Sequence, residues 1–120
     1  MATYIDETVI LRYLLDDNHA QAQKAARTIR EGHTYSSPEI MARVAVTLRD
    51  IYKCPRSLIA NAVEMLCDDI IVIEEDVCRL AGRFFGSTLY DFTDCLMLAR
   101  NALYGYDILS FDKPILKRTI

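Results

Sequence analysis

The sequence predicts one domain, residues 1–120, folded as a three-layer α/β/α sandwich around a short, mainly parallel central sheet. Short β-type runs alternate with longer helical runs, which is typical of parallel sheets joined by right-handed crossovers. The run Ile70–Ile73 is continuously apolar, as expected for a strand that is covered on both faces. Apolar residues make up 52% of the chain, which is enough for a single packed core.

The individual elements follow from these patterns. We expect strands at Thr3–Ile5, Thr34–Ser36, Ile70–Ile73 and Asp107–Phe111. We expect helices over about Glu7–Leu15, Ala20–Glu31, Pro38–Tyr52, Pro55–Leu66, Glu75–Phe85 and Asp91–Ala102, with a short tail helix after Lys113. Asp17 or Asn18 would cap the second helix, and Pro38 suits the first turn of the third. In such folds the functional crevice lies beyond the carboxyl ends of the strands.

Composition excludes several classes of protein. The formal net charge of −3 argues against a general nucleic-acid coat protein, which usually carries a basic excess. An enzyme with an acidic pocket inside a basic rim remains compatible with it, and the candidate rim residues are Arg12, Lys53, Arg56, Lys113, Lys117 and Arg118. No stretch approaches the roughly 20 apolar residues of a membrane span. The opening MATYID lacks the features of a secretion signal, so we expect a cytoplasmic protein.

The cysteines and histidines do not suggest a metal or redox centre. Four cysteines are widely spaced without a Cys-x-x-Cys pair, which favours reduced, mostly buried thiols over disulfides or a zinc site. His19 and His33 are not paired at ligand spacing, and we expect both on the surface.

Three aspartates carry the predicted chemistry. Asp6 directly follows the first expected strand and Asp112 follows the last, so connectivity places both at one edge of the sheet. Asp94 lies in the first turn of its helix, on the same face as Asp91. Each acid has a structural alternative, because each could cap a helix or favour its dipole. Their expected convergence nevertheless predicts a shared site.

Converging carboxylates predict a bound cation, because like charges raise one another's pKa unless a cation is present. Mg²⁺ or Mn²⁺ suits oxygen ligands and can generate a hydroxide nucleophile for phosphodiester cleavage. We therefore predict that Asp6, Asp94 and Asp112 are both metal ligands and catalytic residues.

Four segments of the chain resemble the sequence blocks of the PIN-domain family, and within it the VapC-type toxins of toxin–antitoxin pairs. The segments are IDETVILRYLLDD, PEIMARVAVTLRDIYKCPR, DFTDCLMLA and ILSFDKPIL. Each motif is short, but all four occur in the family's order and cover nearly the whole chain. The resemblance implies a PIN-like fold and a magnesium- or manganese-dependent endoribonuclease. It also implies an RNA substrate, a cognate antitoxin and a homodimer.

The resemblance assigns roles residue by residue. Asp6, Asp94 and Asp112 match the family's metal-binding acids, and Ser110 matches a small hydroxyl residue beside the last of them. Asp91 is a possible accessory residue. The position two after the first acid, often Asn in the family, is Thr8 here.

Arg43 is the main departure from the family pattern, because it stands where the family carries a helical Glu. A guanidinium there would repel a divalent ion, and arginine does not lose its proton. Arg43 could instead bridge two aspartates and block the site. Glu39, one turn earlier on the same face, could supply the missing carboxylate or simply pair with Arg43 on the helix surface.

The sequence therefore leaves two main hypotheses open. One is an active ribonuclease, and the other is a catalytically silent PIN domain that binds an antitoxin or RNA. A magnesium-dependent phosphatase would need an Asp-x-Asp motif, which Thr8 interrupts. A dimer surface could form from the apolar stripe of Val44, Leu48 and Ile51, although core packing also explains such a stripe.

Overall fold

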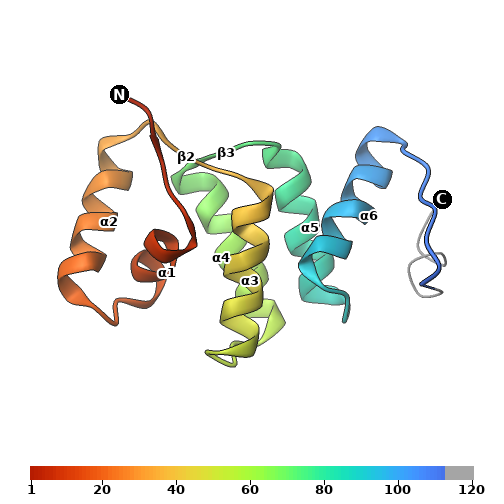
Figure 1. Ribbon diagram of the computed structural model, residues 1–120, viewed down its shortest axis with the longest axis horizontal. Coiled ribbons are helices and arrows are strands. Elements are labelled where there is room, and N and C mark those ends of the chain that lie inside the picture. The colour runs from red at the N-terminus through yellow and green to blue at the C-terminus, as the bar shows by residue number, and fades with distance from the viewer. Residues whose placement is uncertain (113–120) are drawn as a thin grey trace.

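The computed structural model describes residues 1–112 and shows a mainly helical molecule (Figure 1). Within these residues the elements are β1 (Thr3–Tyr4), α1 (Glu7–Leu15), α2 (His19–Glu31), β2 (Thr34–Ser36), α3 (Pro38–Asp50), α4 (Arg56–Asp69), β3 (Ile71–Val72), α5 (Glu75–Ser87) and α6 (Phe92–Tyr104). The expected helices are confirmed, with ends that differ by up to three residues. The expected three-layer α/β/α sandwich is wrong.

The sheet is too small to separate two layers of helices. Its strands pair in parallel in the order β1-β2-β3, and the pairing places Tyr4 beside Tyr35 and Tyr35 beside Ile71. This row of side chains is open to solvent, because Tyr4 is 55% and Ile71 46% exposed. A parallel sheet in a sandwich is covered on both faces, so the apolar run around Ile71 was a misleading signal.

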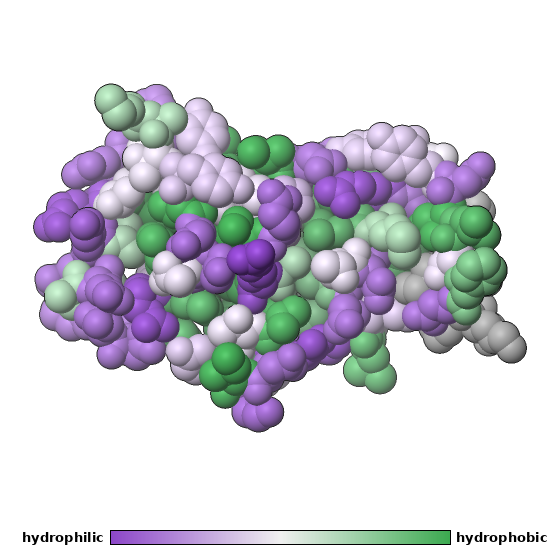
Figure 2. Space-filling view, in the orientation of Figure 1, coloured by the Kyte–Doolittle hydropathy of each residue, from purple (hydrophilic) through white to green (hydrophobic). Residues whose placement is uncertain are grey.

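The last expected strand, Asp107–Phe111, does not form. The chain from residue 105 to 112 is irregular, and Leu109 and Phe111 are 86% and 94% exposed. This segment lies at the end of the molecule beyond α6, on the opposite side from β1 (Figure 1), and its apolar atoms are visible at that end in Figure 2. Apolar β-type residues form a strand only where a neighbouring edge pairs with them. The tail helix expected after Lys113 falls outside the described residues.

The core lies between helices rather than between helices and a sheet. α5 packs along α4 on one side and α6 on the other (Figure 1). Phe85 and Phe92 are fully buried where α5 meets α6, with ring centroids 5.6 Å apart. Burying large apolar side chains is the main source of folding free energy, so these contacts position the start of α6. Within the described residues, no helix has the length and apolar character needed to cross a membrane.

Candidate active-site cavity

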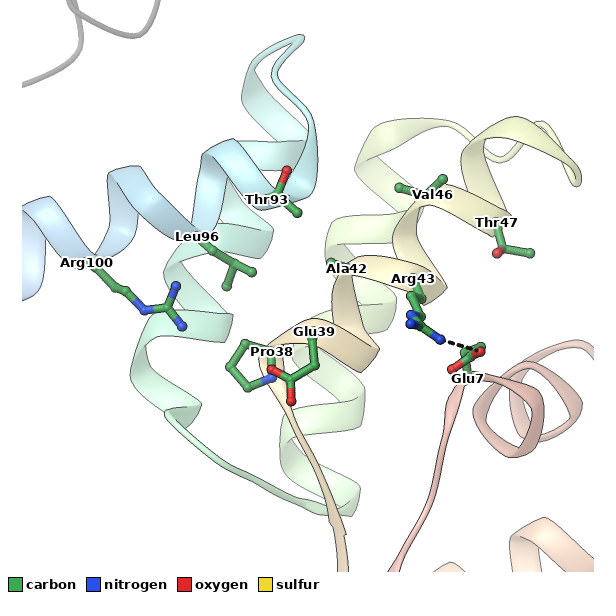
Figure 3. Close-up of a pocket in the computed structure, with 10 residues that line it drawn as sticks. All are labelled: Glu7, Pro38, Glu39, Ala42, Arg43, Val46, Thr47, Thr93, Leu96 and Arg100. Atoms are coloured by element: carbon green, nitrogen blue, oxygen red, sulfur yellow. Dashed lines mark hydrogen bonds and ion pairs between the residues drawn. The ribbon is translucent and has the colours of Figure 1, made fainter. Parts of the chain in front are cut away.

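A cavity of about 620 Å³ lies between the start of α1, one face of α3 and α6 (Figure 3). Its lining residues are Glu7, Pro38, Glu39, Ala42, Arg43, Val46, Thr47, Thr93, Leu96 and Arg100. Three of the four segments singled out in the sequence thus contribute to one cavity. The walls are mostly apolar, and two acids and two guanidinium groups supply their charge.

Arg43 does not contact the predicted metal-binding aspartates through any ion pair found among residues 1–112. Its Nη1 lies 3.3 Å from Oε1 of Glu7, and its side chain is 69% exposed. Figure 3 shows Arg43 extending from α3 towards Glu7. The second oxygen of Glu7, Oε2, is buried without a hydrogen-bond partner among the described residues. Arg43 is therefore a cation on the cavity wall, and the predicted bridge between aspartates is not observed.

Asp6 caps α1. Its Oδ1 accepts hydrogen bonds from the backbone N–H groups of Thr8 and Val9 and from the Thr8 hydroxyl. The Thr8 hydroxyl bond lowers the pKa of Asp6 most, burial opposes it as the next largest effect, and the backbone bonds lower the pKa further. Asp6 thus has the helix-capping role that was the structural alternative to metal binding. Its partner is Thr8, the residue that departs from the family pattern.

Asp94 lies near two other acids. Burial raises the pKa of Asp94, and the like charges of Asp91 and Asp112 raise it further. The backbone N–H of Asp112 donates to Oγ of Ser110 at 3.0 Å, so the predicted accessory serine shapes the chain just before this acid. The third and fourth sequence segments therefore lie close together without the strand that was expected to align them.

The three predicted ligands, Asp6, Asp94 and Asp112, do not form one compact cluster. Among residues 1–112, no group of three or more His, Cys, Asp or Glu side chains could hold a metal ion. Asp94 and Asp112 are near each other, whereas Asp6 is engaged at the start of α1. Mg²⁺ commonly binds one or two protein carboxylates together with water and phosphate, so the Asp94–Asp112 pair has the donor chemistry that this ion requires.

Several residues that shape the site were not identified from the sequence. Glu7 was named only as the first residue of an expected helix, although it lines the cavity and pairs with Arg43. Arg49 holds Asp91 with a 2.8 Å bond from Nη1. Arg100 lines the cavity and donates to both oxygens of Glu74 at 3.2 and 2.7 Å. No sequence signal identifies these pairs, because their members are far apart along the chain.

Arg56 has a structural role instead of the predicted place in a basic rim. Its Nη1 donates to the carbonyl oxygens of Phe85, Thr88 and Tyr90, and its Nη2 donates to that of Leu89. Its guanidinium also lies 4.2 Å from the centre of the Phe85 ring. These bonds satisfy carbonyl groups at the end of α5 and hold the loop that leads into α6.

Burial tests the predictions for the apolar stripe, the histidines and the cysteines. Val44 and Leu48 are in the core, whereas Ile51 is 69% exposed, so core packing explains most of the predicted dimer stripe. His19 and His33 are exposed, which confirms their expected surface positions. Cys67, Cys78 and Cys95 are buried and Cys54 is partly exposed, which confirms mostly buried thiols.

Comparisons with models of protein families, with curated proteins and with solved structures give no match to this chain.

Proposed function

We propose that this protein is a Mg²⁺- or Mn²⁺-dependent endoribonuclease of the PIN-domain toxin (VapC-like) class. The observation that carries the proposal is that three of the four sequence segments line one cavity, through Glu7, α3 and Thr93. The fourth segment approaches the third, because the charge of Asp112 contributes to the raised pKa of Asp94. Segments separated by about a hundred residues in the sequence thus lie near one another. This proximity supports a shared site, in addition to the order of the sequence motifs.

Asp94 and Asp112 would hold the metal ion, with Asp6 as a further ligand. The hydrogen bonds that cap α1 all go to Oδ1 of Asp6, so its Oδ2 is the atom that could serve a cation. When bound, the ion would supply a hydroxide nucleophile and neutralise charge on the phosphate. The pKa of Asp94 is raised by burial and then by the charges of Asp91 and Asp112, and a nearby cation would relieve both effects.

The proposed class also implies partners. It places the protein in the cytoplasm, with RNA as substrate, a cognate antitoxin as inhibitor and a homodimer as the working form.

A second candidate is a catalytically silent domain that binds an antitoxin or RNA. The observation that favours it is Arg43, whose positive charge lies on the cavity wall where the resemblance expects a carboxylate. A fixed guanidinium weakens the binding of a divalent ion nearby. In this case the three aspartates would have structural roles, as Asp6 visibly does.

The test is cleavage of a labelled RNA in Mn²⁺ by the unmodified chain and by Asp94→Asn. If Asp94 is a ligand, we expect this variant to lose more than about 100-fold in rate, because removing a ligand disrupts a metal site more than removing a residue that orients the ligand. Asp107→Asn is the matched control, since Asp107 is exposed and lies outside the acid pair. Equal rates for all three proteins would contradict the proposal.

Arg43→Glu separates the two candidates. If the unmodified chain is inactive and Arg43→Glu cleaves RNA, the silent domain is the correct description. If the unmodified chain cleaves and Asp94→Asn does not, the ribonuclease proposal stands.

A further inference from the structure

Two arginines on the helices that form the cavity are held by strong, specific partners: Arg100 of α6, which lines the cavity, and Arg49 of α3, which does not. Arg100 donates to both carboxylate oxygens of Glu74, and its side chain is 33% exposed. Arg49 bonds Asp50 at 2.7 Å and Asp91 at 2.8 Å, with its side chain 26% exposed. Such short, partly buried, charge-assisted bonds restrict a guanidinium to its structural partner.

Arg43 differs from these residues. Its ion pair with Glu7 is a single contact of 3.3 Å through Nη1, and 69% of its side chain is exposed. Glu7 itself is only 24% exposed, but one contact of this length restrains the mostly exposed guanidinium less than the paired bonds of Arg100 and Arg49 restrain theirs. Among the cationic residues that line the cavity, Arg43 is thus the one positioned to meet an incoming anion.

A nucleic-acid backbone would need a cation to approach this cavity. Glu7 and Glu39 line it, and Asp94 follows the lining residue Thr93 in the sequence, so carboxylates repel a phosphate on this face. A planar guanidinium matches the oxygens of a phosphate and can bind two of them at once. Figure 3 shows Arg43 on the α1 side of α3, while Arg100 projects from α6.

We propose that Arg43 anchors a phosphate of single-stranded RNA at this cavity, and so acts as a substrate-binding residue instead of a block to the metal site. The inference rests on the proposed RNA substrate and deepens it by naming the contact. Glu7 would then hold the guanidinium in place while the site is empty. Arginine in place of the family's glutamate at position 43 would then add a contact to the RNA backbone.

The experiment is fluorescence anisotropy with a labelled single-stranded RNA of 12 nucleotides, in EDTA so that no metal-dependent cleavage occurs. We expect Arg43→Gln to weaken binding about 5- to 10-fold and to reduce the slope of log affinity against log salt concentration by about 0.7, the value for one phosphate contact on a single strand. Arg43→Lys should weaken binding less than Arg43→Gln and leave the salt slope unchanged, because it keeps the charge but loses the two-oxygen contact of the guanidinium.

Arg30→Gln is the matched control, since Arg30 is an exposed arginine in the last turn of α2 and does not line the cavity. It should bind RNA like the unmodified chain. The inference is overturned if Arg43→Gln binds RNA as tightly as the unmodified chain, if Arg30→Gln weakens binding equally, or if the unmodified chain binds no RNA. Thermal unfolding of both variants would show that their folds are intact.

The outcomes also separate this inference from the proposed function. RNA cleavage that depends on Asp94, with unchanged RNA binding in Arg43→Gln, would leave the ribonuclease standing and remove the anchor. Loss of RNA binding in Arg43→Gln, without any Mn²⁺-dependent cleavage by the unmodified chain, would support the anchor and contradict the ribonuclease.

Discussion

Asp6 shows at the scale of a single residue how a structural role and a proposed catalytic role can coincide. Its carboxylate accepts three hydrogen bonds at the start of α1, and these bonds lower its pKa. The same carboxylate is a proposed metal ligand. The two roles differ in chemistry, because capping needs a hydrogen-bond acceptor, whereas binding a cation benefits from a negative charge.

Substitutions at Asp6 separate these roles. We expect Asp6→Ala to lower the free energy of unfolding by about 1 kcal/mol, the usual cost of losing an N-cap. Asp6→Asn should change it by only a few tenths, because asparagine caps as well as aspartate does. Urea unfolding at pH 7 measures both. Equal losses in the two variants would show that the charge, and not the cap, stabilises the fold.

The pH dependence of Asp6 follows from the direction of its pKa shift. Its pKa in the folded state is lowered from 3.8, so its stabilising effect is fully present above that value. The effect is lost as the pH falls through the folded-state pKa. It should be modest, because the group is exposed. Unfolding of Asp6→Asn between pH 5 and 2 should lack this contribution.

At the scale of elements, the packing of α5 on α4 depends on small residues. A Cβ atom at Gly86 would lie 2.8 Å from Cβ of Ala60, and one at Gly82 would lie 3.1 Å from Cγ1 of Val63. The first neighbour is fixed to its backbone, so the two helices would have to separate. The second belongs to a side chain that can adjust.

Gly86→Ala tests whether helix propensity or tertiary packing decides stability here. Helix propensity alone would make the alanine variant more stable than the glycine protein by about 0.5–1 kcal/mol. Overpacking costs about 1–3 kcal/mol, so we expect a net loss of stability and a lower melting temperature. Gly82→Ala should lose less. A melting temperature raised by Gly86→Ala would show that the helices adjust freely.

At the scale of the whole molecule, a single core encloses three of the four thiols. Cys67, Cys78 and Cys95 are at most 3% exposed, and burial raises their pKa values to about 11, 12 and 11. Thiolates are the reactive form of cysteine, so both the burial and the raised pKa of these thiols protect them from reagents. Cys54 lies at the edge of the core and is partly exposed.

Thiol labelling therefore reports on the integrity of the core. With a disulfide reagent at pH 8, we expect one thiol to react rapidly and the other three to react only as the protein unfolds. Cys54→Ser should remove the rapid phase. Several rapid thiols in the unmodified chain would mean that the core opens without global unfolding.

Local signals in the sequence were reliable where local physics decides the structure. Helix ends were predicted within a few residues, because capping residues such as Asn18 and the proline at the start of α3 act within one turn. The shared face of Asp91 and Asp94 follows from helix geometry alone. The buried faces of the helices were also readable from their apolar spacing.

Contacts between residues far apart in the sequence decided the sheet, the fold class and the pairing of Arg43. A strand needs a partner edge, so the apolar segment Asp107–Phe111 could not be distinguished from an unpaired one, and the α/β sandwich built on it was wrong. The pairing of Arg43 with Glu7 joins residues 36 positions apart, and no local pattern indicates it. Sequence patterns therefore specified the helices and the candidate acids, because caps and periodicity act over a few residues. Packing between distant segments specified the sheet, the cavity and the partner of Arg43.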